Sequence, residues 1–272
     1  MVILVFGDIF GKPGRRAIRS ALPGLVEKYK PDFIFGNAEN IAGGKGTNWK
    51  TMNEMLSLGF HGLTGGNHSW DNKEVYQIFE VEERLLRPIN LPSSDRYPCP
   101  GKGARLFRNS KGESLFVINA LGRVFMDNVQ CPFHAIDEVL ETVNDGVPVL
   151  VDFHADATSE KTAMGWHLDG RVTAVVGTHS HVQTADERIL PRKTAFICDI
   201  GMSGSFDSVI GMAHQEILQR YLTKRPVPFK TATENPGVGC VVITTGERRT
   251  ATKIERVRMT VNVGPDGDTT ND

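Results

Sequence analysis

The run VILVFGD, residues 2–8, decides how this chain is interpreted, because it is an apolar, strand-like segment that ends in a carboxylate. Four later runs have the same design and also end in residues of metal-ligand type. They are DFIFGNAEN (32–40), GLTGGNH (62–68), VPVLVDFH (147–154) and TAVVGTHSH (173–181). Open α/β sheets bind ligands outside the carboxyl ends of their strands. We therefore expect the five run ends to meet at one edge of a sheet.

The run ends together supply two carboxylates, two carboxamides and four imidazoles. These residues are Asp8, Glu39, Asn40, Asn67, His68, His154, His179 and His181. Mn, Fe and Zn accept such a mixture of oxygen and imidazole ligands, whereas Mg and Ca prefer oxygen. Two cations about 3.5 to 4 Å apart can neutralise a phosphoryl group and generate a hydroxide nucleophile. The pattern predicts a two-metal hydrolase of phosphoesters.

Composition places the chain among ordinary globular proteins, with 272 residues, 40% hydrophobic and 23% charged. We expect a single domain over residues 1–260 and a disordered tail over residues 261–272. The net charge of -1 argues against broad attraction to nucleic acid or to an anionic membrane. We therefore expect a small phosphorylated substrate as the partner, without a stable nucleic-acid complex and without membrane binding.

The N-terminal run lacks a basic region before it and a cleavage pattern after it, and no apolar stretch approaches the ~20 residues that span a bilayer. We therefore expect a cytoplasmic protein. The four cysteines contain no CxxC pair, so reduced thiols are the default. The C-terminal strands offer an edge through which two copies could pair, which keeps a homo-oligomer open.

Strand and helix signals alternate along most of the chain, which favours βαβ units with parallel neighbours. Helices are expected after the first run, with a buried face of Ala17, Ile18, Leu22, Leu25 and Val26, and over residues 48–58, 72–85, 133–144, 159–168 and 213–221. Further strands are expected at LFVINA (115–120) and TAFICDI (194–200). PFKTAT (228–233), VGCVVITT (238–245) and ATKIERVRM (251–259) alternate as antiparallel edge strands do. Residues 87–103 are expected to form a rim loop.

Long sequence blocks resemble the calcineurin-like metallophosphoesterases, and in particular their bacterial YmdB-like 2',3'-cyclic-nucleotide phosphodiesterases. The similar blocks occur in the family's order and span about Val2 to Met259. They are GDIFGKPGRR (7–16), NAENIAGGKG (37–46), GGNHSWD (65–71), DFHADATSEK (152–161), GTHSHVQTAD (177–186) and DIGMSG (199–204). The resemblance implies a four-layer αββα sandwich, with two mixed sheets flanked by helices.

The resemblance also implies a division of labour among the run ends. One metal would be held by Asp8, Glu39, Asn40 and His181. The second would be held by Glu39, Asn67, His154 and His179, so that Glu39 bridges. His68 would protonate or stabilise the leaving sugar oxygen. The implied reaction opens 2',3'-cyclic nucleotides to 3'-nucleotides with two transition-metal ions, iron or manganese in first place and zinc as the alternative.

Two departures from the wider superfamily narrow the resemblance. Phe10 stands where most members have a metal-binding His, and Glu39 followed by Asn40 stands where most bridge with Asp. The YmdB-like branch shares both departures. They weaken any transfer of metal identity from better-known phosphatases.

Other roles for these residues remain open from sequence alone. Asp8 could cap a helix, Glu39 and Asn40 could shape a turn, and His68 could be a structural partner of Asp71. Substrate contacts are undecided for Arg15, Arg16, Lys45, Asp156, Lys161 and Asp199, whereas His61, His134, His167 and His214 lack run-end partners. A general metallophosphatase, a phosphodiesterase of another substrate and a nucleotide-sensing regulatory protein are the alternative functions.

Overall fold

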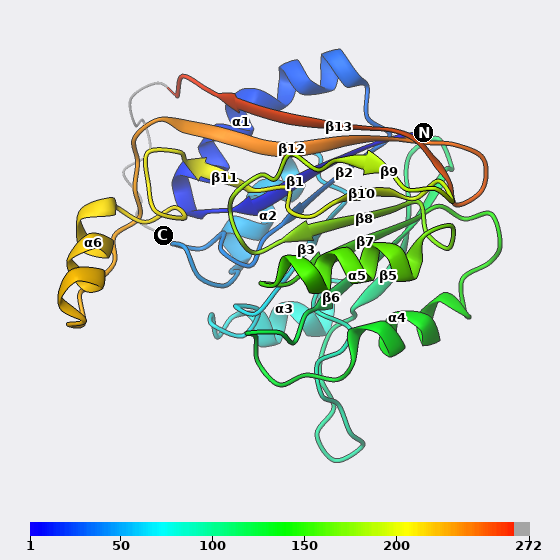
Figure 1. Ribbon diagram of the computed structural model, residues 1–272, viewed down its shortest axis with the longest axis horizontal. Helices are drawn as coiled ribbons and strands as arrows, with labels where there is room; N and C mark the ends of the chain where they lie inside the picture. The colour runs from blue at the N-terminus through cyan, green and yellow to red at the C-terminus, as the bar shows by residue number, and fades with distance from the viewer. Residues whose placement is uncertain (264–272) are drawn as a thin grey trace.

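Two β-sheets pack face to face and carry helices on their outer faces in the computed structural model, which describes residues 1–263 (Figure 1). This is the four-layer αββα arrangement of the sequence prediction, which is therefore confirmed. The predicted tail falls mostly on residues 264–272, which lie outside the described residues. Val261 still donates its N–H to the Pro236 carbonyl at 2.9 Å. The single domain over residues 1–260 stays a prediction.

The first sheet has seven strands in the order β13-β12-β11-β1-β2-β3-β4. Parallel pairing joins β1 to β2, β2 to β3 and β3 to β4, and the carboxyl end of β1 also pairs in parallel with β11. The strands are β1 (Val2–Ile9), β2 (Phe33–Asn37), β3 (Gly62–Thr64), β4 (Leu85–Leu86), β11 (Met202–Ser205), β12 (Pro236–Thr245) and β13 (Ala251–Thr260).

The second sheet has six strands in the order β5-β6-β7-β8-β10-β9. Its four inner strands run parallel, and its two edge strands run antiparallel to their neighbours. The strands are β5 (Ala104–Arg108), β6 (Ser114–Leu121), β7 (Val149–His154), β8 (Ala174–Thr178), β9 (Arg188–Ile189) and β10 (Ala195–Ile197).

Five of the six described helices cover the outer faces because their apolar sides pack onto the sheets, whereas the last one along the chain projects away from them (Figure 1). The six are α1 (Gly11–Tyr29), α2 (Trp49–Ser57), α3 (Val75–Val81), α4 (Pro132–Leu140), α5 (Thr158–Leu168) and α6 (His214–Thr223). One core cluster lies between α1 to α3 and the first sheet, one between the two sheets, and one between the second sheet and α4 and α5. Each sheet is thereby fixed on both faces, which holds its carboxyl edge in place.

Several element predictions need correction. The predicted helix 72–85 is shorter, because the chain is extended again by β4 at Leu85. PFKTAT forms only an isolated bridge at Thr231, and VGCVVITT belongs to β12, which has neighbours on both sides. Val26 is 39% exposed, so it lies off the buried face of α1. The short strands β4, β5, β9 and β11 were not predicted.

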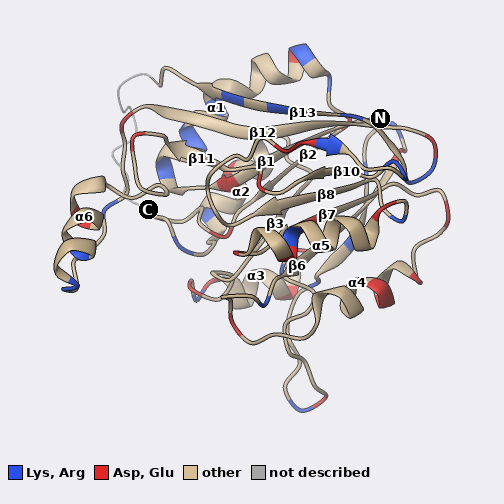
Figure 2. Cartoon of the chain, viewed as in Figure 1, with Lys and Arg blue, Asp and Glu red and all other residues tan. Residues whose placement is uncertain are grey.

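Charged residues of opposite sign gather in different places on the sandwich. Figure 2 shows Lys and Arg along α1 and β13, and acidic residues on α4.

Within the described part of the chain, no helix is long and apolar enough to cross a membrane.

Candidate metal centre

The carboxyl ends of five strands bring the predicted ligands together. Asp8 lies at the end of β1, and His154 is the last residue of β7. The other residues sit in the turns directly after β2, β3 and β8. They are Glu39, Asn40, Asn67, His68, His179 and His181. Asp8 does not cap α1, whose N-cap residue is Phe10.

Glu39, His154 and His179 form a first set of converging donors, which we call the His154 group. His154 Nε2 lies 3.2 Å from Glu39 Oε2 and 3.0 Å from His179 Nδ1. Asn67 directs its side-chain oxygen into the same space, at 2.9 Å from His154 Nε2. The family resemblance implies that these four residues hold one ion.

Asp8, Glu39 and His181 form a second set, which we call the His181 group. His181 Nε2 lies 3.7 Å from Asp8 Oδ1. Asn40 contacts both neighbours through its amide nitrogen, at 2.8 Å from Glu39 Oε1 and 3.2 Å from His181 Nε2. Its amide therefore has to turn over before its oxygen can serve as a ligand.

Glu39 belongs to both groups and divides its two oxygens between them. Oε1 accepts from the Asn40 amide on the His181 side, and Oε2 faces His154 and accepts from the His68 backbone N–H at 3.1 Å. The side chain is 1% exposed. This is the position that a bridging carboxylate of a dinuclear centre occupies.

The electrostatics of the donors favour a cation. Burial opposes ionisation of Glu39, but the positive charge of His154 prevails and lowers the pKa of Glu39 to about 2. Burial also opposes protonation of His154, yet Glu39 and Asp8 raise the pKa of His154 to about 9. Burial and the charge of His154 lower the pKa of His179 to about 4, which leaves a neutral ring with a lone pair for bonding.

Two observations show that the donor set fits metal ions. Asp8 Oδ1 is buried without a hydrogen-bond partner among residues 1–263, and burial raises the pKa of this carboxyl to about 6. A buried carboxylate oxygen without a partner is costly unless something positive binds it. A Cβ on Gly66 would lie 2.2 Å from Glu39 Oε2 and 2.7 Å from His154 Nε2, so glycine keeps the space between these donors open.

Residues 4–257 match the sequence model of the YmdB-like proteins. The chain belongs to the YmdB-like family. The family assignment made from the sequence blocks is thus confirmed. A Bacillus subtilis (strain 168) protein named 2',3'-cyclic-nucleotide 2'-phosphodiesterase is 43% identical over 259 residues, which cover 94% of this chain and 96% of that protein.

Two solved structures also resemble this YmdB-like chain closely. A hypothetical protein from Thermus thermophilus matches with a TM-score of 0.88 and 38% identity, over 96% of this chain and 99% of that one. A phosphatase of Mycoplasma pneumoniae matches with a TM-score of 0.88 and 31% identity, over 96% and 93%. The likeness therefore extends over nearly the whole described fold.

Phe10 lies beside the His181 group of this YmdB-like chain. Its side chain is 3% exposed and packs edge-on against the His181 ring, with centroids 5.4 Å apart. Phe10 therefore supports a candidate ligand by contact.

Buried polar residues that were not predicted orient the His154 group. The Thr178 hydroxyl donates to Asp152 Oδ1 at 2.7 Å, so it accepts from His154 Nδ1 at 2.9 Å. Nε2 is then left to face Glu39. The Asp152 carboxylate accepts in turn from Asn37 at 3.2 Å and from the Thr64 hydroxyl. A carboxylate inside the apolar run VPVLVDFH was the sequence signal for this chain of hydrogen bonds.

A buried ion pair holds the turn that carries His179 and His181. Asp199 Oδ2 accepts from Lys161 Nζ at 2.7 Å and from the Ser180 N–H at 2.9 Å. The two histidines on either side of Ser180 have φ values of +105° and +62°. Residues other than glycine adopt such φ values only where the surrounding structure imposes them. Lys161 and Asp199 thus hold the turn at Ser180 in position through the bond between Asp199 and the Ser180 N–H.

His68 lies at the rim of the centre. Its side chain is 29% exposed, and its Nδ1 lies 2.8 Å from Asp71 Oδ2. Lys45 Nζ approaches the same carboxylate at 4.0 Å. The hydrogen bond between His68 and Asp71 suits both interpretations of His68, because a carboxylate can hold a structural histidine or orient a catalytic one.

Other polar residues from the sequence analysis serve the fold or lie apart. Arg15 is buried and donates to the Ile41 carbonyl at 2.6 Å and to Glu54 at 2.7 Å. It therefore anchors the turn that follows Asn40. His61 accepts the Ile34 N–H at 3.1 Å, far from the candidate ligands in the sheet.

Proposed function

We propose that this chain is a metal-dependent phosphodiesterase that hydrolyses 2',3'-cyclic nucleotides to 3'-nucleotides. The single observation that carries the proposal is Glu39, whose two oxygens serve two overlapping donor groups. The family membership and the printed activity of the B. subtilis relative support the choice of substrate.

The proposed ligand sets follow the two groups. Asp8, Glu39, Asn40 and His181 would hold one ion, and Glu39, Asn67, His154 and His179 would hold the second. A bound pair of transition-metal ions neutralises phosphoryl charge and lowers the pKa of water. The carboxamide ligands keep the negative charge of the site low, which helps an anionic diester approach.

His68 is the proposed proton donor. Ring opening requires water to attack phosphorus as the bond from phosphorus to the 2'-oxygen breaks, and the departing oxygen then needs a proton. With Nδ1 held by Asp71, the opposite nitrogen of His68 is directed away from that carboxylate and can carry this proton. The partial exposure of His68 allows it to reach a substrate.

Metal identity and setting form part of the same proposal. The mixture of imidazole and oxygen donors suits iron or manganese, with zinc as the alternative. We also propose a cytoplasmic location, a small nucleotide as the partner, and neither a stable nucleic-acid complex nor membrane binding. Pairing of two copies through the C-terminal strands remains a prediction.

Metal analysis combined with a substrate panel tests the function. The panel contains 2',3'-cAMP, 3',5'-cAMP, a chromogenic phosphodiester and a chromogenic phosphomonoester. We expect 2',3'-cAMP to be the best substrate and the product to be the 3'-monophosphate. Faster hydrolysis of the monoester would instead identify a general metallophosphatase.

A nucleotide-sensing role is tested separately. If hydrolysis underlies the cellular effect of the wild-type protein, cells that carry the Asp8→Ala or Glu39→Ala protein should not show that effect. Equal effects of wild type and both variants would favour the sensor.

A further inference from the structure

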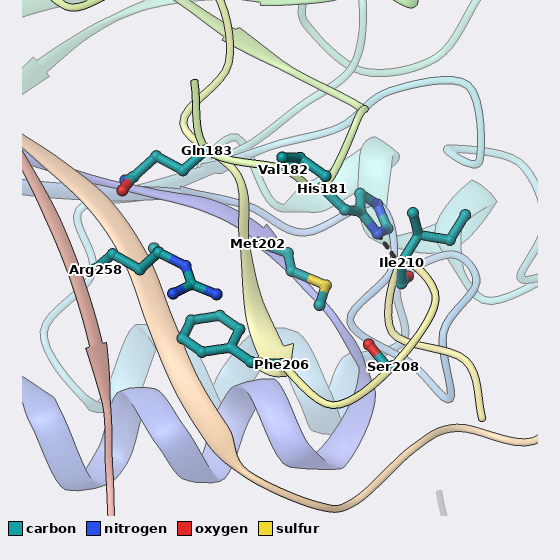
Figure 3. A pocket seen from close by; sticks show the side chains of 9 residues that line it. His181, Val182, Gln183, Met202, Phe206, Ser208, Ile210 and Arg258 are labelled. Atoms are coloured by element: carbon teal, nitrogen blue, oxygen red, sulfur yellow. Dashed lines mark hydrogen bonds between the residues drawn. The ribbon is translucent and has the colours of Figure 1, made fainter. Parts of the chain in front are cut away.

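A cavity of about 320 Å³ adjoins the candidate metal centre and shares His181 with it. Apolar side chains of Val182, Met202, Phe206 and Ile210 contribute to its lining, and Arg258 closes one end (Figure 3). The volume falls in the range of about 300 to 1,000 Å³ that is usual for small-molecule pockets. The metal centre thus has a side pocket with mainly apolar walls and one cation.

The strand register explains why this cavity adjoins the metal centre. Asp8 pairs with Met202 of β11, and Gly239 of β12 pairs with Arg258 of β13. β1 and β13 are each antiparallel to β12, so their carboxyl ends lie at the same edge of the sheet. A ligand held at Asp8 can therefore extend sideways over Met202 toward Arg258.

Arg258 faces the cavity with its donors unused. Its guanidinium carbon lies 4.1 Å from the centre of the Phe206 ring, and Figure 3 shows the two groups together at the end of the pocket. Within residues 1–263 no ion pair or hydrogen bond engages this guanidinium. Arg256, on the same strand, is instead paired with Glu187 at 3.2 Å. The N–H groups of Arg258 remain available to a ligand.

The roof of the cavity is fixed by Gln183. Its side-chain amide donates to the carbonyls of Ile200 at 3.3 Å, Cys240 at 3.2 Å and Val257 at 3.1 Å. These bonds tie the segment after His181 to strands β12 and β13. The pocket is thus already formed before a ligand enters, which lowers the entropic cost of binding.

We propose that this cavity binds the nucleobase of the cyclic nucleotide substrate, an inference that rests on the function proposed above. A single ribose separates the phosphorus from the base, so a base subsite has to lie just beyond a metal ligand, as this cavity lies beyond His181. Flat bases stack on aromatic rings and on guanidinium planes. Every base also presents acceptor atoms on its edge, which arginine donors bind.

Comparing two cyclic substrates in the metal-loaded enzyme tests this subsite. Glycerol 1,2-cyclic phosphate has the same five-membered phosphodiester ring as 2',3'-cAMP but lacks ribose and base. We expect Arg258→Met to lower kcat/KM for 2',3'-cAMP by about 10- to 100-fold, mainly through KM. Turnover of glycerol 1,2-cyclic phosphate should stay unchanged. Arg256→Met is the matched control, because it removes the same charge from the same strand outside the cavity.

Inhibition by adenosine gives a second measurement, because adenosine carries the base without a phosphate for the metals. It should inhibit hydrolysis of glycerol 1,2-cyclic phosphate by the wild type, and less so by Arg258→Met. Equal loss of both substrates in Arg258→Met, or no inhibition by adenosine, would overturn the subsite. If inorganic phosphate alone relieved the inhibition by adenosine, the cavity would be an anion site, and the base subsite would again be overturned. If the wild type hydrolyses neither cyclic substrate, the proposed function itself fails.

Discussion

The two halves of the candidate metal centre, the His154 group and the His181 group, are built with unequal support. His154 is fully buried and is oriented by the Thr178 hydroxyl, which Asp152 orients in turn. His181 donates from Nδ1 to the Ile210 backbone carbonyl at 2.8 Å, without a buried side chain of residues 1–263 behind that bond, and it borders the side cavity. The His154 group is therefore preorganised, whereas the His181 group has adaptable donors at the open side.

The remaining donors of the His181 group show the same contrast. Asp8 Oδ1 lacks a hydrogen-bond partner among the described residues, and Asn40 presents its amide nitrogen. Ligands that are already oriented lose less freedom when an ion binds. We therefore expect the His154 group to bind its ion more tightly, and the His181 group to exchange its ion more readily beside the substrate.

The largest effect is expected where the two halves join. Glu39→Gln removes the charge that both ions share while nearly preserving the shape of the side chain. Because each ion contributes several kcal/mol to the transition state, activity should fall by more than about 10⁴-fold. Plasma mass spectrometry should show that both metals are depleted. Retention of one full equivalent would contradict a shared role for Glu39.

His68→Gln comes next, because His68 belongs to neither half. Turnover of 2',3'-cAMP should fall by about 10²- to 10⁴-fold with metal content unchanged. A diester with a nitrophenolate leaving group should be affected less, since that group departs without a proton. Asp71→Asn is the control, with a smaller loss because Asp71 only orients the ring. Parallel loss of metal and activity would make His68 structural.

The sequence indicated which residues meet at this edge better than it indicated the contacts that support them. The run ends could be recognised because a strand of period two that stops at a polar residue delivers it to the carboxyl edge. The division of the ligands into two sets came from family resemblance. The preference of Asn40 for its amide nitrogen, and the hydrogen bond of His181 to Ile210, depend on contacts between segments far apart in the chain.

The fold was predictable to a similar degree. Long, strongly apolar runs predicted β1, β2, β7 and β8, because the apolar side chains of these strands are buried in the core. Short strands such as β4 and β11 have too few residues for a periodic signal. They form because neighbouring strands supply hydrogen-bond partners, and sequence periodicity does not encode those partners. The cavity beside His181 could not be predicted from the sequence for the same reason, since β11 forms part of its wall.

Thr178→Val tests the support of one half on its own. The substitution keeps the volume of the side chain but leaves His154 Nδ1 without its acceptor. One of the two metals should bind about 10- to 100-fold more weakly, which staged chelation would measure. Thr173→Val is a matched control, because Thr173 is also fully buried and bonds to the Val149 N–H away from the metals. Equal weakening of both metals would break the comparison.

The smallest effect on activity is expected from the element that both halves share, the turn at Ser180. Lys161→Met leaves the Asp199 carboxylate hydrogen-bonded to the N–H groups of Ser180 and Gly201, so the turn keeps its shape. The free energy of unfolding should still fall by about 3 kcal/mol, because a buried charge has lost its partner.

Lys111→Met makes the same change in an exposed ion pair with Asp32 and should cost less than about 1 kcal/mol. Because Ser180 lies between His179 and His181, any loss of metal affinity in Lys161→Met should be shared by both ions. A loss confined to one ion would mean that the turn supports only one half. The ion pair of Lys161 and Asp199 would then add to the asymmetry of the centre, instead of supporting its two halves equally.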